Sequence, residues 1–83
     1  MQDRFIALTR LAMILLETID AEPGIAADGH FPAYEKIMSR KEFDWMVCRL
    51  EKANLIEIAE TQLGNGPNFK ALYPSLSYLA FKK

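Results

Sequence analysis

Residues 39–56, with the sequence SRKEFDWMVCRLEKANLI, carry the clearest structural pattern in this chain. Ser39 is followed three residues later by Glu42, which is the spacing of a capping box, and the pattern therefore predicts a helix over residues 40–53. Apolar side chains return along it at helical spacing within an arc of roughly 120°, the width of a face that packs on a core. They are Phe43, Met46, Val47, Leu50 and Ala53. We expect this face to be buried.

The opposite face of the predicted helix is polar, mostly cationic, and interrupted by a tryptophan. It carries Lys41, Asp44, Trp45, Cys48, Arg49 and Lys52. An indole on such a face is not what packing alone requires, and two interpretations stand. Either the neighbouring hairpin or a dimer partner covers Trp45, or its ring contacts DNA or a protein. Lys41 and Arg49, four residues away on either side, can lie over the ring.

The residues after this helix predict a β-hairpin. Alternating apolar and polar residues indicate a strand over 55–62, and a returning strand covers 68–73. Between them, Asn65 precedes a glycine, which is a strong turn signal. Pro74 ends the second strand, and a short helix over 75–81 follows.

The sequence from the capped helix to the hairpin resembles the recognition helix and wing of winged helix-turn-helix domains. In that family the phrase before the wing usually reads Leu-x-x-x-Gly-Leu-Ile. Here residues 50–56 read LEKANLI, with Asn54 at the glycine position; Asn is the next best residue at positive φ. The resemblance covers most of the chain and implies an α+β, mostly α fold. It implies one domain over 1–83, with three helices, a β-hairpin wing and a short C-terminal helix.

The N-terminal segment predicts an amphipathic helix over 3–20. Its core face spans an arc of roughly 140°. That face carries Phe5, Leu8, Leu11, Ala12, Leu15, Leu16 and Ile19. Three further apolar residues, Ile6, Met13 and Ile14, lie outside that arc. Either the hairpin or the C-terminal segment covers them within one chain, or they form a homodimer interface, a common arrangement among the proteins that this chain resembles.

Residues 21–31, AEPGIAADGHF, have the composition of a loop. The acidic residues in and around it lack the alternating spacing of a calcium loop, and we expect a solvated surface. His30 has no partner that the sequence identifies, and we expect it to be exposed or to cap a helix. Pro32 at a first-turn position predicts a short helix over 32–38. Together with the helix over 40–53, it makes a helix-turn-helix.

Composition and charge limit the classes of function. Eighty-three residues, 51% of them hydrophobic, make one small domain with enough apolar material for a core. No run of about 18 apolar residues is present, so no membrane span is expected. One Cys and one His form neither an internal disulfide nor a zinc site, and a reducing, cytoplasmic setting is expected. The net charge is −1, but residues 35–83 carry eight basic and six acidic side chains.

We do not expect an enzyme. Nucleophilic catalysis needs a nucleophile, a base and a group that orients the base, and Cys48 has no histidine near it along the chain. Residues 64–66, GNG, precede no helix N-terminus that would hold a phosphate. No cofactor and no metal ion is expected either.

Surface recognition remains, and it leads to two functional hypotheses. The first is a transcriptional regulator that binds double-stranded DNA, with the 40–53 helix in the major groove and the 63–70 wing on phosphates. Its candidate contacts are Lys36, Ser39, Arg40, Lys41, Asp44, Trp45, Arg49, Lys52, Asn65, Asn68 and Lys70. The second is a winged-helix module that binds a protein and no DNA, which the mixed charge fits better.

Overall fold

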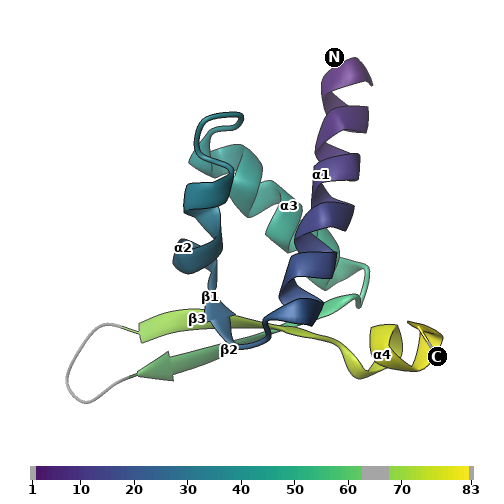
Figure 1. The fold of residues 1–83 in the computed structure, drawn as a ribbon, viewed down its shortest axis with the longest axis vertical. Helices are drawn as coiled ribbons and strands as arrows, with labels where there is room; N and C mark the ends of the chain where they lie inside the picture. Colours follow the sequence, from purple (N-terminus) through teal and green to yellow (C-terminus); the bar gives the residue numbers. More distant parts are fainter. Residues whose placement is uncertain (1, 63–67, 83) are drawn as a thin grey trace.

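The computed structural model describes residues 2–62 and 68–82 as a small α+β fold. The elements in chain order are α1 (Gln2–Ala21), β1 (Ile25–Ala26), α2 (Ala27–His30), the 3-10 segment η1 (Phe31–Ala33), α3 (Arg40–Lys52), β2 (Ile56–Gln62), β3 (Asn68–Pro74) and α4 (Leu76–Lys82). Helices α1, α2 and α3 lie on one face of the sheet, and α4 lies at one end of it (Figure 1).

Three antiparallel strands form the sheet, in the order β1-β3-β2. Leu72 of β3 lies at its centre, opposite Ile58 of β2 and Ile25 of β1, and is fully buried. The Gly24 amide donates to the Leu72 carbonyl at 2.9 Å. Gly24 has a φ of 91°, a conformation that a residue with a Cβ rarely adopts. The sheet therefore fixes the segment that joins α1 to α2.

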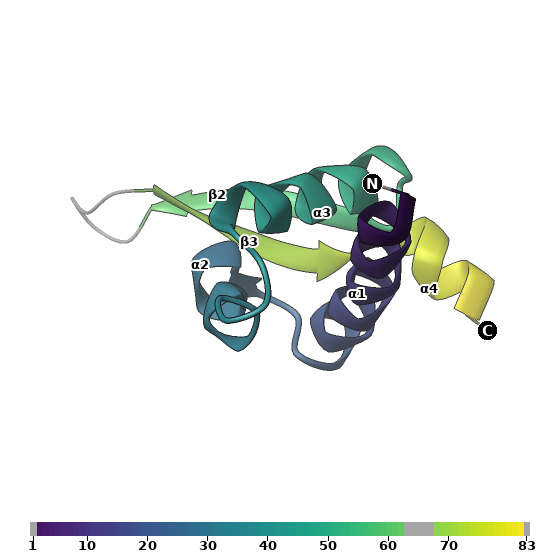
Figure 2. The same cartoon turned by 90° about the horizontal axis from the view of Figure 1, so that it is seen from above.

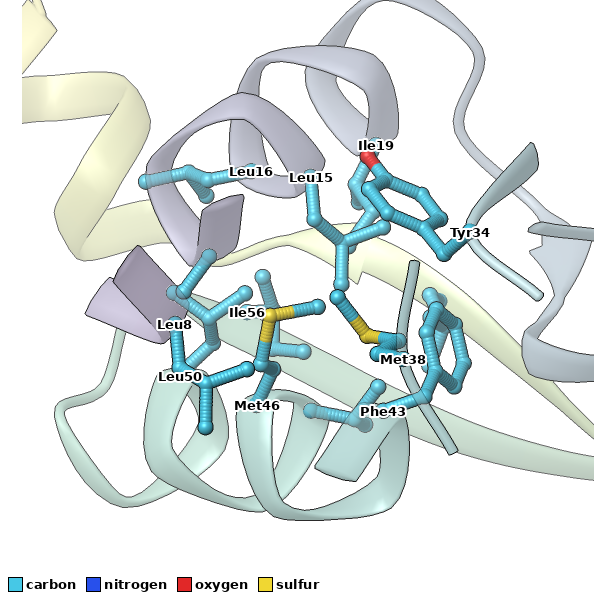
Figure 3. Packing of buried hydrophobic residues seen from close by; sticks show 13 residues of the cluster. Leu8, Leu15, Leu16, Ile19, Tyr34, Met38, Phe43, Met46, Leu50 and Ile56 are labelled. Atoms are coloured by element: carbon cyan, nitrogen blue, oxygen red, sulfur yellow. The ribbon is translucent and has the colours of Figure 1, made fainter. Parts of the chain in front are cut away.

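The core lies where one face of α1, one face of α3 and the sheet meet (Figure 3). Leu15 and Ile19 of α1 are fully buried against Phe43 and Met46 of α3. Burial of a side chain of this size contributes roughly 1.5–3 kcal/mol to folding. The two long helices thus hold each other in place, and the position of α3 depends on α1.

Most predicted element bounds agree with the structure to within one residue. The helices predicted over 3–20, 40–53 and 75–81 correspond to α1, α3 and α4, and the strands over 55–62 and 68–73 to β2 and β3. The capping box of Ser39 and Glu42 is formed, and Asn54 has a φ of 61°, as predicted. Two residues assigned to buried faces, Phe5 and Ala53, are exposed.

The helix predicted over 32–38 is wrong, and so is the assignment of 21–31 to a loop. Pairing of β1 with β3 fixes residues 25–26, and helical backbone starts directly after them, in α2 and η1. Pro32 does lie in a first turn, but of η1. The chain leaves η1 at Tyr34, whose φ is −115° and whose carbonyl accepts from the Met38 amide at 3.1 Å. Turns therefore occupy most of 34–38.

Candidate functional site

The candidate site is built on α3, which is fixed at its back and at its N-terminus. Its buried residues are Phe43, Met46, Val47 and Leu50. The Glu42 amide donates to Ser39 Oγ at 3.2 Å, and the Ser39 amide donates to the Glu42 carboxylate at 3.0 Å. These bonds satisfy amides that have no partner within a helix, so α3 begins sharply at Arg40.

Arg4 of α1 clamps this N-terminus. Its Nε and Nη2 each donate to one oxygen of the Glu42 carboxylate at 2.7 Å, and Nη2 also donates to the Ile37 carbonyl at 3.1 Å. The hydrogen bonds from Arg4, followed by the one from the Ser39 amide, lower the pKa of Glu42 to about 2. One guanidinium therefore joins α1, the turn before α3 and the capping box.

The outward face of α3 carries three exposed cations: Lys41, Arg49 and Lys52. Among the residues that the structure describes, none of the three forms an ion pair. Cys48 lies between them and is exposed. Lys36, in the turn before α3, and Lys70, on β3, are also exposed. The buried back of the helix and this cationic front are the arrangement that the sequence predicts.

Arg40 differs from these cations because it is held by its own chain. Its Nε donates to Asp44 Oδ1 at 2.8 Å, and its Nη2 lies 2.7 Å from Asp28 Oδ1. The guanidinium carbon lies 5.3 Å from the centre of the Phe31 ring and 5.7 Å from that of Phe43. Arg40 thus ties α3 to α2 and η1, and two carboxylates balance its charge.

Trp45 of α3 is half-buried where α3 contacts α1. The Phe5 ring meets it edge-on, with the ring centres 5.8 Å apart and an interplanar angle of 70°. The Arg49 guanidinium carbon lies 5.7 Å from the centre of the indole. Of the two interpretations of Trp45, the structure shows partial cover, which comes from Phe5 of the same chain and not from β2 or β3, and part of the indole stays exposed.

A groove of about 440 Å³ separates α3 from the hairpin and from α2. Its apolar wall includes Val47, Ile58 and Leu72. Three carboxylates and two cations line it as well: Asp28, Asp44, Glu51, Arg40 and Lys70. Acidic groups on this side of α3 weaken the attraction that the cations on its outward face exert on a polyanion.

The remaining predicted site residues are placed as follows. Asn65 lies outside the described residues. Asn68 begins β3, paired with Gln62 of β2. The proposed interface residues Ile6, Met13 and Ile14 are all exposed on α1.

Sequence reasoning missed three residues that organise the site: Arg4, Phe5 and Asp28. Arg4 and Glu42 are 38 residues apart, and no local pattern connects them. The expectation for His30 is wrong, because this side chain is buried and makes no capping hydrogen bond, although the residue precedes η1. Its Nε2 has no hydrogen-bond partner in the described part of the chain, and burial lowers the pKa of the imidazole. His30 lies in α2, which directly follows β1, so its position depends on the pairing of β1 with β3, which we did not predict.

No group of three or more potential metal ligands occurs among residues 2–62 and 68–82. No helix in those ranges combines the length and apolar character needed to cross a bilayer. Family models, curated proteins and solved structures were each compared with this chain, and none matches it.

Proposed function

We propose that this chain is a winged helix-turn-helix domain that binds double-stranded DNA as a transcriptional regulator. The order of the elements supports this fold: a long helix, a short strand, short helical segments, a second long helix and a hairpin. So does the sheet order, in which β1 pairs with β3 across from β2. In this proposal α3 is the recognition helix, and the β2–β3 hairpin is the wing.

The observation that carries the proposal is the row of Lys41, Arg49 and Lys52 on the exposed face of a helix with a buried back. Phosphate contacts dominate the affinity of proteins for DNA, and each contact releases condensed counterions. Cations without a carboxylate partner are available for such contacts at no cost in broken ion pairs. A helix fixed at its N-terminus can present them in the major groove without losing much conformational freedom.

The candidate residues divide into contacts and supports. Lys41, Arg49, Lys52, Lys36 and Lys70 are the proposed phosphate contacts. Ser39 caps α3, and Asp44 orients Arg40, so these three position the helix. The half-buried Trp45 packs α3 against Phe5 of α1, and the Arg49 guanidinium lies over its ring.

Fluorescence anisotropy of a labelled random duplex, measured from 20 to 300 mM salt, tests the proposal. We expect an observed affinity that falls steeply with salt, by a slope of about 0.9 for each phosphate contacted. In the Lys41→Ala/Arg49→Ala/Lys52→Ala variant the slope should fall by about three for each bound chain. The Lys41→Arg/Arg49→Lys/Lys52→Arg variant keeps all charges and should keep the slope. Absence of binding at the lowest salt contradicts the proposal, as does an equal loss in both variants.

A module that binds a protein is the second candidate, and one observation favours it. Phe5 and Ile37 are about half exposed, and Phe5 lies against the half-buried Trp45. These residues lie near the Arg4 clamp, where Lys41 and Glu42 line a shallow groove. Aromatic residues and Arg are enriched at protein interfaces. If the folded protein does not bind the labelled duplex at any salt concentration in that series, a protein-binding function is favoured over DNA binding.

A further inference from the structure

The outward face of α1 carries apolar side chains that no described segment covers. Ile6, Met13 and Ile14 are 49%, 49% and 52% exposed. Of the two interpretations of these residues, cover by β2, β3 or α4 within one chain is therefore excluded. Single exposed apolar residues are ordinary on a protein surface, but these three lie along one helix.

A second apolar surface lies beside the C-terminal end of α1. Leu76 and Phe81 of α4 are 76% and 88% exposed, and an ion pair between Lys82 and Asp20 holds α4 next to α1. Figures 1 and 2 show α4 projecting sideways from this end, whereas the N-terminal turns of α1 stand clear of it. Ile6 therefore lies near the end of α1 that is opposite α4, whereas Met13 and Ile14 lie near the middle of the helix.

Two charges on the outward face of α1 are arranged in a self-complementary way. Arg10 and Glu17 are exposed and are seven residues, or about two turns, apart on the same side of α1. Neither has an ion-pair partner among the residues described. If a second α1 lies antiparallel, related by a two-fold axis between Met13 and Ile14, each Arg10 faces the partner's Glu17. The same operation places each Ile6 toward the end of the partner's α1 that carries α4.

We propose that two copies of this chain form a two-fold symmetric dimer through antiparallel α1 helices, with reciprocal Arg10–Glu17 pairs and with α4 covering the partner's Ile6. Interfaces of this isologous kind are the commonest in homo-oligomers. A stable interface takes about 800 Å² from each partner, about a seventh of the 5880 Å² surface of this chain. One face of a helix about 30 Å long supplies only part of that area, so α4 is a necessary contributor. The dimer does not depend on whether α3 binds DNA.

Sedimentation equilibrium without DNA tests the dimer, and we expect twice the 9.5 kDa chain mass at micromolar concentrations. Arg10→Glu and Glu17→Arg each place like charges opposite one another twice. Each variant should raise the dissociation constant about tenfold or more. An equimolar mixture of the two variants should restore dimerisation, because in the mixed pair every acid again faces a base. The same recovery is expected in the Arg10→Glu/Glu17→Arg double variant.

Met13→Glu, which puts a charge at the two-fold axis, should give a folded monomer by circular dichroism. The matched control is Ile37→Glu, because Ile37 is 53% exposed but lies before α3; this variant should remain dimeric. A monomeric parent protein would overturn the proposal. So would single charge variants that fail to recover when mixed, or a loss of the dimer in Ile37→Glu equal to that in Met13→Glu.

Discussion

Arg4 and Glu42 show how a single contact at the residue scale determines where the candidate site lies. Glu42 is found from local spacing, because the capping box joins it to Ser39 three residues away. Arg4 comes from the other long helix and adds two hydrogen bonds to the same carboxylate. The same guanidinium holds the Ile37 carbonyl. The orientation of α3 on α1 therefore depends on a charge that the capping motif alone does not require.

The Glu42 clamp should make stability depend on pH in acid. Its pKa is about 2 in the folded protein, against an ordinary value of 4.5, so the folded state favours the ionised carboxylate. The stabilisation is complete above about pH 4.5 and is lost as the pH falls toward 2. In thermal melts, Glu42→Gln should lower the melting temperature at pH 7 but not at pH 2. The exposed Glu35→Gln is the control, and a Glu42→Gln deficit that persists at pH 2 would contradict this assignment.

His30 should give a separate dependence at higher pH. Burial lowers its pKa below the ordinary 6.5, so protons bind more tightly to the unfolded chain. The folded state holds the neutral imidazole, so the free energy of unfolding is highest above pH 6.5 and decreases as the pH drops below that value. His30→Leu removes the titrating group and the unpaired Nε2. Urea unfolding at pH 7 and pH 5 should show a smaller difference for the variant than for the parent. Equal differences would contradict the prediction.

At the scale of elements, α3 and the segment before it were predicted with opposite success. α3 begins and ends at local signals, namely the capping box and the left-handed Asn54. α2 and η1 depend instead on the two-residue strand β1, which is stabilised by pairing with residues more than 40 positions later. A strand this short has no periodicity of its own. The helix predicted over 32–38 was therefore misplaced, while the core faces of α1 and α3 were largely correct.

Asn54 offers a test at this scale. Asn54 has a φ of 61°, a conformation that strains a residue with a Cβ. The nitrogen of its side-chain amide donates a hydrogen bond to Ser77 Oγ at 2.9 Å. Asn54→Ala loses that bond and keeps the strain, whereas Asn54→Gly loses the bond but relieves the strain. The alanine variant should be less stable than the glycine variant by about 1 kcal/mol in chemical unfolding. Equal stabilities would mean that the left-handed turn after α3 contributes nothing.

At the scale of the whole molecule, the middle strand β3 connects the N-terminal and C-terminal parts of the chain. Leu72 pairs with residues of both outer strands and has no exposed surface. Leu72→Ala should therefore cost about 2–5 kcal/mol in urea unfolding. Leu72→Ala should still unfold in a single transition, because the helices share this core. The exposed Ile37, which lies before α3 and outside the proposed dimer interface, is the control, and Ile37→Ala should change stability by less than about 1 kcal/mol.

The sequence was sufficient for the class of fold and for the cationic face of α3, because both follow from hydrophobic periodicity and capping. It was insufficient for the Arg4 clamp, for the Asp28–Arg40 pair and for the cover of Trp45 by Phe5, since each joins segments distant in the sequence. These contacts change the roles of the candidate residues. Arg40 and Trp45 are engaged within the chain, and Lys41, Arg49 and Lys52 are the exposed cations of α3 that form no ion pair with a described residue.

The proposal that α3 is a DNA-binding helix is tested most directly by an amide NMR titration of the protein with a short duplex at low salt. We predict that the shifted resonances concentrate in residues 39–52 and at Lys70, and that the shifts reverse when salt is added. Resonances of the outward face of α1 should stay in place, because that face is not part of the DNA contact. Shifts confined to α1 and α4, or no shifts at all, would contradict the account.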